Sequence, residues 1–232
     1  MKVKILTTLP EFFPGILGAS LIGKGLQKGL WSCEIINIKD FALNKQRKID
    51  DTTFGGGNGM VMLPEVLANA LDFALKGTSN AQIFYMSPVG QLYNQELARN
   101  ISHLKEIIFI CARFEGIDER VIKEYNIAQI SIGDYILSGG DLAAMVVLEA
   151  AIRLLPGILA NQNTLNDESF SNKDGYGKLL EYPQYTRPAL WRGKRVPEIL
   201  LSGNHESIRK WRLEKSIEIT TKFRPDLIKK NI

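Results

Sequence analysis

Short runs of β-branched and aromatic residues alternate with longer segments of helical periodicity over the first two thirds of the chain. Several of the short runs are apolar throughout, as expected of strands that are buried on both faces of a sheet. The intervening segments place apolar residues three and four positions apart, which is typical of amphipathic helices. This alternation predicts an α/β fold with a mostly parallel sheet that is covered by helices on both faces.

The periodicity also gives the approximate bounds of these elements. We expect strands at Val3–Leu9, Cys33–Ile38, Gln82–Met86, Ile107–Cys111 and Ala128–Ile132. We expect helices at Phe12–Lys28, Pro64–Lys76, Asn94–Leu104, Asp118–Tyr125 and Leu142–Leu155.

The composition of the chain changes after Pro156 and Gly157. Residues 158–186 are rich in Asn, Ser, Asp and Gly and show little periodicity, which is typical of a mobile connection. Further on, residues 197–201 and 205–222 read as helices. We therefore expect one domain over residues 1–160, a flexible linker over 161–181 and a small C-terminal helical domain over 182–232.

The net charge of the chain is unevenly distributed. The formal charge of +4 over 232 residues is the sum of −3 for residues 1–186 and +7 for residues 187–232. A basic C-terminal segment favours a partner that carries phosphates, such as a nucleic acid, although a solvated helix face can carry the same charge.

Several classes of protein are excluded by the composition. No apolar run approaches the ~20 residues that cross a bilayer, and the N-terminus lacks the apolar stretch of a secretory signal. We therefore expect a cytoplasmic protein with no membrane partner. Cys33 and Cys111 lie far apart in apolar strand-like runs and are expected to be small buried residues rather than a disulfide or a zinc site. The only histidines, His103 and His205, exclude multi-histidine metal chemistry.

The most conspicuous local motif is the segment Asp-Asp-Thr-Thr-Phe-Gly-Gly-Gly-Asn-Gly-Met at residues 50–60. Its glycines allow the backbone to approach a ligand closely. The segment has no Gly-Lys-Ser/Thr for a nucleoside triphosphate, and Met60 and Met62 stand where a dinucleotide-binding motif requires glycine. A ligand-binding loop and a flexible surface turn are both compatible with this sequence.

Three further loops directly follow expected strands, at residues 86–90, 112–120 and 133–141. In open α/β sheets, ligands bind at the edge formed by the carboxyl ends of the strands. Each loop alone can be an ordinary structural turn, but three loops at one edge predict a pocket.

Four residues in or after these loops are candidates for a capping or a binding role. Ser138 is a candidate cap for the following helix. Glu115 and Asp118 can bind a cation or hydroxyl groups, or cap the helix that begins near Asp118. Arg153, at the end of an apolar helix, either has an anionic or carbonyl partner or is held there by the helix dipole.

Six segments in order along the chain resemble the bacterial tRNA (guanine-N1)-methyltransferase family of the SPOUT superfamily. They are residues 50–60, 85–88, 111–120, 131–141, 182–188 and 201–212. The resemblance covers nearly the whole chain. It implies a SPOUT-type, mostly parallel sheet with a deep trefoil knot, S-adenosyl-L-methionine as cofactor, a homodimer whose active site is shared between subunits, and a C-terminal domain that grips the tRNA.

The resemblance also implies which residues bind the cofactor. They are Tyr85, Met86, Ser87, Pro88, Ala112, Glu115, Gly116, Ile132, Gly133, Asp134, Tyr135, Ile136, Leu137, Gly139 and Gly140. The chain departs from the family pattern at Ala112, which is usually glycine, and at Phe114, which is usually tyrosine. A third departure is a longer connection at residues 172–178.

The implied reaction is methyl transfer to N1 of the guanine immediately 3′ of the anticodon, position 37. This nitrogen carries a proton at neutral pH, so the reaction needs a general base. The family uses an Asp directly before Ser-Phe; Glu168 stands there in this chain, with Asp167 as the alternative. Arg153 matches the family arginine that interacts with the guanine carbonyl. The residues expected to contact tRNA are Asp50, Gly55, Gly59, Arg187 and His205.

Two alternative functions are weighed against this reaction. One is a SPOUT-type methyltransferase that modifies a ribose 2′-hydroxyl of RNA, and the other is a non-catalytic RNA-binding protein. The segments at residues 50–57 and 185–188 argue against the first, and the carboxylate at Glu168 together with Arg153 argues against the second. The sequence leaves a requirement for Mg²⁺ open.

Overall fold

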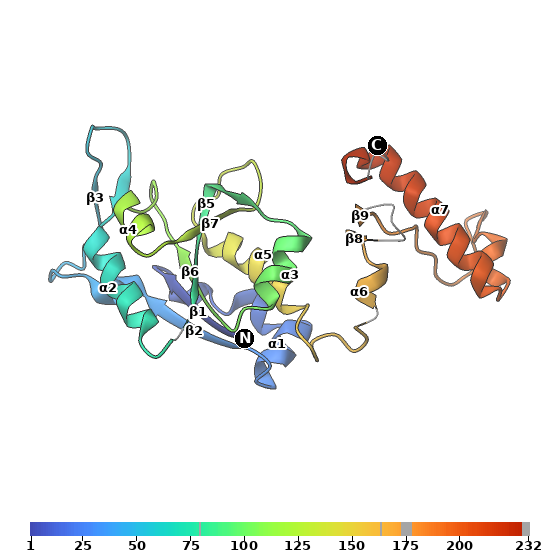
Figure 1. The fold of residues 1–232 in the computed structure, drawn as a ribbon, viewed down its shortest axis with the longest axis horizontal. Coiled ribbons are helices and arrows are strands. Elements are labelled where there is room, and N and C mark those ends of the chain that lie inside the picture. Colours follow the sequence, from blue (N-terminus) through green and yellow to red (C-terminus); the bar gives the residue numbers. More distant parts are fainter. Residues whose placement is uncertain (79, 163, 173–177, 229–232) are drawn as a thin grey trace. The chain divides into compact units, whose positions relative to one another are not determined.

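The computed structural model describes residues 1–78, 80–162, 164–172 and 178–228. The chain divides into two compact units, Met1–Ala160 and Asn161–Ile232 (Figure 1). Most of the unusual connection at residues 172–178 lies outside the described residues. No helix among those described is long and apolar enough to cross a membrane.

A five-stranded parallel sheet forms the centre of the first unit. Its strands run in the order β2-β1-β6-β5-β7, and every neighbouring pair is parallel. Their bounds are β1 (Lys2–Thr7), β2 (Ser32–Asn37), β5 (Gln82–Leu92), β6 (Glu106–Cys111) and β7 (Ala128–Ser131). The predicted α/β fold with a parallel sheet is therefore confirmed.

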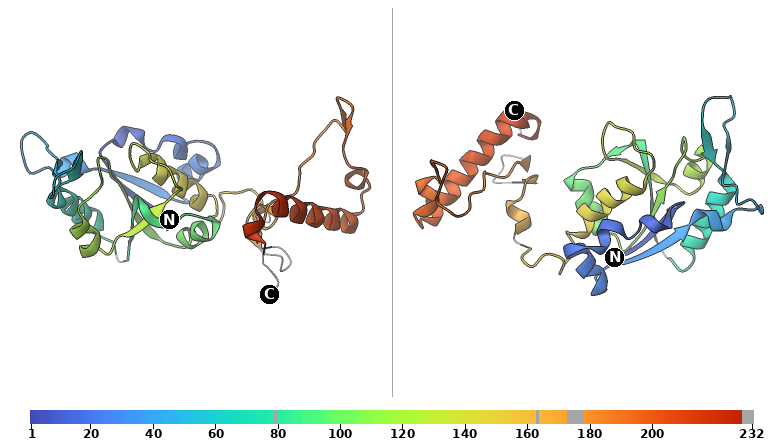
Figure 2. Two further views of the ribbon diagram at one scale, coloured as in Figure 1. Left: turned by 90° about the horizontal axis from the view of Figure 1, so that it is seen from above. Right: turned by 180° about the vertical axis from the view of Figure 1, so that it is seen from behind.

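Helices cover both faces of this sheet (Figures 1 and 2). The longer helices are α1 (Ser20–Gln27), α2 (Pro64–Leu75), α3 (Gln95–Ser102), α4 (Glu119–Glu124) and α5 (Asp141–Ile152). Successive side chains of β6 point to opposite faces of the sheet, and so they pack into two separate hydrophobic layers. Ile107 and Phe109 pack with α1, α3 and α5, whereas Ile108 and Ile110 pack with α2 and α4.

The helix predicted over Phe12–Lys28 is wrong. The chain there forms two short 3₁₀ turns, η1 (Pro10–Phe12) and η2 (Gly15–Gly18), before α1 begins. Gly15 has φ +50°, and Ala19 is extended with φ −110° and ψ 166°, so neither residue has the dihedral angles of a continuing helix. The apolar spacing that predicted one helix instead places Phe13 and Leu17 in the core.

The end of β5 also differs from the prediction, which placed a loop directly after Met86. The strand continues to Leu92, and both Met86 and Gln91 lie opposite Ile130. The intervening residues bulge out of the ladder, where Pro88 has no N–H to donate. Gly90 brings this bulge close to the backbone of β7.

We expect Gly90→Ala to destabilise the first unit by about 1–3 kcal/mol, the usual cost of overpacking. An added Cβ would lie 2.3 Å from the Ile130 nitrogen and 2.4 Å from the Gln129 carbonyl carbon, neither of which can move without disturbing β7. The measurement is the free energy of unfolding in urea. Val89→Ala in the same bulge is the control, because Val89 is 83% exposed and the change adds no atom. Equal losses in both variants would contradict the packing argument.

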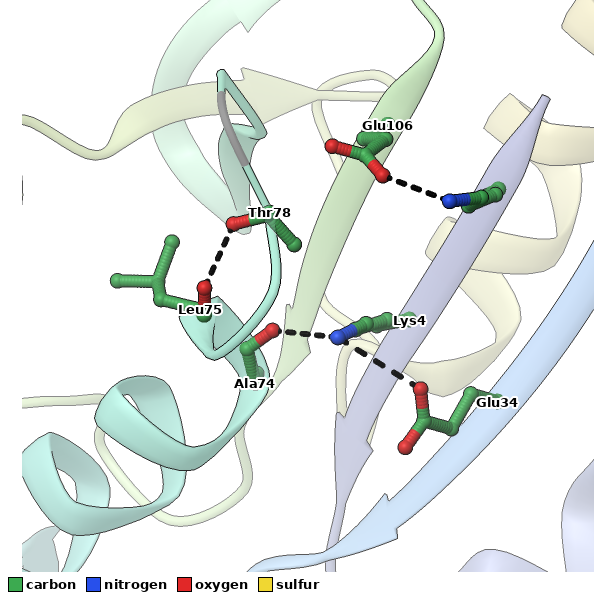
Figure 3. Close-up of polar contacts among 7 residues, drawn as sticks. Lys4, Glu34, Ala74, Leu75, Thr78 and Glu106 are labelled. Carbon is green, nitrogen blue, oxygen red and sulfur yellow. Dashed lines mark hydrogen bonds and ion pairs between the residues drawn. The ribbon is translucent and has the colours of Figure 1, made fainter.

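Charged residues close the opposite, amino-terminal edge of the sheet (Figure 3). Lys4 of β1 donates from Nζ to the Ala74 carbonyl at 2.6 Å and lies 3.7 Å from a carboxylate oxygen of Glu34. Lys2 forms an ion pair with Glu106 at 3.1 Å. Lys4 therefore ties β1 to β2 and to the last turn of α2, where a helix C-terminus favours a cation.

The second unit is built around one long helix, α7 (His205–Phe223). Leu179 is its only buried apolar side chain among the described residues. Thr220 Oγ1 accepts from the Leu180 N–H at 2.9 Å and donates to the Ser216 carbonyl at 2.6 Å. The shorter elements of this unit are α6 (Thr164–Asp167), β8 (Ser171–Asn172), β9 (Lys178–Leu179), β10 (Leu190–Trp191), β11 (Lys194–Arg195), η4 (Glu198–Leu201) and η5 (Pro225–Leu227).

Candidate active site

A cavity of about 250 Å³ lies at the carboxyl edge of the sheet. The bulge of β5, the loops after β6 and β7, and the start of α5 enclose it. The predicted cofactor residues that line it are Tyr85, Met86, Ser87, Pro88, Ala112, Glu115, Gly116, Ile132, Gly133, Tyr135, Ile136, Leu137, Gly139 and Gly140. Asp134 belongs to the same loop but does not line the cavity. Lining residues that were not predicted are Arg113, Phe114, Ile130, Ser131, Ser138 and Ala143.

Glycines allow the loops around this cavity to pack closely. Gly116 has φ +123°, and a Cβ there would lie 2.9 Å from the hydroxyl of Tyr85. Gly140 donates its N–H to the Ala112 carbonyl at 3.0 Å. A Cβ on Gly140 would lie 3.1 Å from the Cys111 Cα and 3.2 Å from the Met86 Cβ. Ala112 itself has no positive φ, so its methyl group fits where the family usually has glycine.

The cavity wall combines apolar side chains with backbone polar groups. Ala112 is 6% exposed, and Tyr85 is 9% exposed. Burial raises the pKa of the Tyr85 hydroxyl, so this side chain stays neutral at physiological pH. Such a wall suits a ligand with an uncharged ring that is recognised through main-chain donors and acceptors.

The structure settles two capping predictions. Asp118 caps α4, because its carboxylate accepts from the Arg120 N–H at 2.9 Å. Ser138 does not cap α5. That helix begins at Asp141 with Gly140 at the N-cap position, and no side chain caps it. Two successive glycines follow the serine, and the helix starts three residues after it, at Asp141.

Asp141 forms a buried hydrogen bond directly behind the cavity. It is 2% exposed and accepts from Thr7 Oγ1 at 2.5 Å, which joins the start of α5 to the end of β1. Burial raises the pKa of the Asp141 carboxyl group, and the hydrogen bond from Thr7 opposes this change. The Arg113 guanidinium lowers the pKa and the Glu11 carboxylate raises it, both with smaller effects than burial.

We expect Asp141→Asn to stabilise the protein relative to the wild type as the pH rises. Because the folded pKa is raised, the folded chain keeps a proton that the unfolded chain releases near pH 3.8. Folding then binds a proton, and wild-type stability falls as the pH rises from this value through the folded pKa. Asparagine still accepts from Thr7 and does not titrate. The measurement is the difference in unfolding free energy between the two proteins across this window. A constant difference would contradict the assignment.

The glycine-rich segment forms a hairpin that is attached to the rim of the cavity. Its strands are β3 (Asp50–Thr52) and β4 (Met60–Met62), paired antiparallel. The Met60 carbonyl accepts from the Glu115 N–H at 2.9 Å, and a Cβ on Gly59 would lie 2.5 Å from the Glu115 side chain. Gly55 is exposed at the tip of the hairpin, and Asp50 is half-buried at its base without lining the cavity.

The predicted catalytic residues lie in different parts of the chain. Arg153 caps the C-terminal end of α5. At 1.5 Å per residue it lies about 18 Å along the axis from Asp141, which begins the helix beside the cavity. Asp167 ends α6 in the second unit, and half-buried Glu168 follows it. Arg187 and His205 are exposed in this unit. The first unit therefore brings most of the predicted cofactor residues together but holds Arg153 at the far end of α5.

The two cysteines are free, as predicted. Cys111 is fully buried, and Cys33 is half-buried against the core. Burial raises the pKa of the Cys33 thiol to about 12, so it is not a thiolate nucleophile at neutral pH. Among the described residues, no three Asp, Glu, His or Cys side chains gather as metal ligands.

A parallel sheet with a cavity enclosed by loops at the carboxyl ends of its strands defines an α/β protein whose cavity lies where open α/β sheets bind their ligands. The chain belongs to the tRNA (guanine-1)-methyltransferase family, TrmD, whose model matches residues 1–230.

Relatives that carry the name tRNA (guanine-N(1)-)-methyltransferase match almost the full chain. The protein from Rickettsia prowazekii (strain Madrid E) is 52% identical and that from Rickettsia akari (strain Hartford) 51% identical, each over 99% of this chain and 98% of its own length. The protein from Wolbachia pipientis subsp. Culex pipiens (strain wPip) is 50% identical over 98% of this chain and 97% of its own length.

Proposed function

We propose that this protein transfers the methyl group of S-adenosyl-L-methionine to N1 of the guanine at position 37 of tRNA, immediately 3′ of the anticodon. The observation that carries the proposal is the gathering of the family's loop motifs around one cavity. Motif residues that are widely separated in the sequence, such as Tyr85, Gly116 and Gly140, meet there.

The residues of the cavity fit this cofactor. The adenine ring and the ribose are served by the backbone of the loops that contain Met86, Ala112 and Ile132, and by apolar walls such as Leu137. The cofactor supplies an electrophilic methyl group on a sulfonium. We assign Mg²⁺ no protein ligands, since no cluster of suitable side chains is present among the described residues.

Glu168 is the proposed general base. Guanine N1 becomes nucleophilic only when its proton leaves, and a carboxylate on the segment after α6 can accept this proton. Asp167, one residue earlier, is the alternative base. Arg153 is proposed to stabilise the negative charge that develops on guanine O6 as N1 is deprotonated.

A homodimer with shared active sites accounts for the position of Arg153. Its own cavity opens at the other end of α5, so we propose that Arg153 acts at the cavity of the partner subunit. Apolar side chains at the start of the same helix and beside it favour an interface: Leu142 is 57% exposed, Ile16 is 63% exposed and Val146 is 47% exposed. η2, which contains Ile16, packs against α5, because a Cβ on Gly15 would lie 3.2 Å from the Met145 side chain.

We further propose the family's deep trefoil knot for the chain from β5 to α5. Two backbone hydrogen bonds support it, because they hold the loops after β5, β6 and β7 against one another. The Gly140 N–H donates to the Ala112 carbonyl after β6, and the Tyr93 N–H after β5 donates to the Ser131 carbonyl of β7 at 2.8 Å. We propose that residues 182–232 form a helical tRNA-binding domain in a cytoplasmic enzyme and that residues 161–181 are a linker whose last residues, Leu179 and Leu180, pack against this domain.

The test is methyl transfer from labelled S-adenosylmethionine to tRNA transcripts with guanine or adenine at the target position, followed by nucleoside analysis. We expect label only in N1-methylguanosine and only with guanine present. Label in ribose would replace this proposal with a 2′-O-methyltransferase. No label from a folded protein would favour a non-catalytic RNA-binding protein. Parallel reactions with EDTA and with added Mg²⁺ test the requirement for this ion.

A further inference from the structure

A small hairpin in the second unit carries an exposed aromatic ring among cations. Strands β10 and β11 pair so that Trp191 lies directly opposite Lys194. Arg192 and Gly193 form the two-residue turn, with φ +46° and +76°, as in the tight turns that match the twist of paired strands. In the left view of Figure 2, this hairpin (orange) projects away from α7.

The hairpin has a defined structure despite its exposure. The Val196 N–H donates to the Ala189 carbonyl at 2.9 Å and closes the end of the hairpin opposite the turn. The guanidinium carbon of Arg192 lies 4.9 Å from the centre of the Trp191 ring. Trp191 is 56% exposed, and so a large part of its surface is free for contact with another molecule.

The charge around this ring indicates the kind of molecule that it contacts. Residues 187–197 contain Arg187, Arg192, Lys194 and Arg195 and no acidic residue. Cations attract the phosphates of a nucleic acid, and an exposed indole offers a flat surface on which an unstacked base can lie. Base recognition in single-stranded RNA loops uses this combination of aromatic and guanidinium groups.

We propose that Trp191 stacks on an unpaired nucleobase of the tRNA while Lys194 and Arg195 contact the phosphates beside it. The inference rests on the proposed function for the identity of the RNA, and it assigns the β10–β11 hairpin as a binding site distinct from the cofactor cavity. Stacking tolerates any base, so the hairpin contributes affinity and position rather than a choice of sequence.

The experiment measures binding of unmodified tRNA transcript to the full-length protein without cofactor. Trp191→Ala is expected to weaken binding about 5- to 150-fold, the range that follows from loss of one stacked base. Trp191→Phe and Trp191→Tyr are expected to restore most of the affinity, whereas Trp191→Leu, which is apolar but not flat, is not. Thermal unfolding of each variant verifies the fold, and Trp191→Phe keeps the test valid if the alanine variant unfolds.

Two further readouts separate stacking from other roles. Lys194→Gln and Arg195→Gln are each expected to reduce the salt dependence of binding by about one phosphate contact, whereas Trp191→Ala leaves it unchanged. The second readout uses a series of transcripts that each lack one base. One of these transcripts is expected to bind wild type and Trp191→Ala with equal affinity, because the base that stacks on Trp191 is absent from it.

The inference would be overturned if Trp191→Leu bound tRNA as tightly as wild type. It would also be overturned if no single abasic site removed the difference in affinity between wild type and Trp191→Ala. A changed oligomeric state of Trp191→Ala without RNA, together with unchanged tRNA affinity, would instead make the hairpin a protein interface and would also overturn it. Failure of the proposed function is seen separately, since it concerns methylation by the wild type rather than RNA affinity of the variants.

Discussion

Glu168→Gln is expected to lower the rate of methyl transfer to tRNA by about 10²- to 10⁴-fold, the usual contribution of a general base. Glutamine keeps the shape of the side chain but cannot accept the proton of guanine N1. Affinities for S-adenosylmethionine and for tRNA are expected to stay within about twofold, since the site on the first unit is untouched. The measurement is a single-turnover reaction with both substrates saturating.

Asp167→Asn is the matched control, because it removes the neighbouring carboxylate at the end of α6. We expect it to keep most of the activity. The pH profile gives an independent test: the residual rate of Glu168→Gln should rise with pH, as guanine N1 loses its proton to the solvent instead. If only Asp167→Asn abolished turnover, the base would be Asp167, and the alignment on Ser169 and Phe170 would be wrong.

The sequence predicted the parts of the fold in which burial leaves a local pattern of apolar residues. β6 is apolar at every position from Ile107 to Cys111 because it lies in the middle of the sheet with helices on both faces. The pattern failed where backbone geometry overrides spacing. Gly15 and Ala19 have backbone angles that interrupt the single helix predicted from the apolar residues. Gly90 allows β5 to continue beyond a bulge that contains Pro88, where the sequence predicts a loop.

The site was predictable only in part, for a related reason. Loops after parallel strands gather at one edge by topology, and so the cavity follows from the order of the elements. The hydrogen bond between Thr7 and Asp141 joins residues 134 positions apart, and so no local sequence pattern predicts it. Ser138 looked like a helix cap, yet the glycines that follow it let the chain pack against Cys111 before α5 starts.

Substitution of Arg153 tests the proposal that the active site is shared between subunits. Removing its guanidinium in Arg153→Ala is expected to lower methyl transfer by about 10²- to 10³-fold, as for other groups that stabilise an oxyanion. Leu137→Trp is expected to block cofactor binding, because it adds bulk to a cavity of only about 250 Å³. Leu137 is 37% exposed, so the larger ring can be accommodated without unfolding.

The decisive measurement combines the two variants in one dimer, co-expressed with different tags and purified through both. If Arg153 serves the partner's cavity, one of the two sites has an intact cavity and an intact arginine, and the mixed dimer should show about half of the wild-type activity. If Arg153 serves its own cavity, every site carries one defect, and the mixed dimer should be nearly inactive. The length of α5 favours the first result, since about 18 Å separates Arg153 from the end of the helix that borders its own cavity.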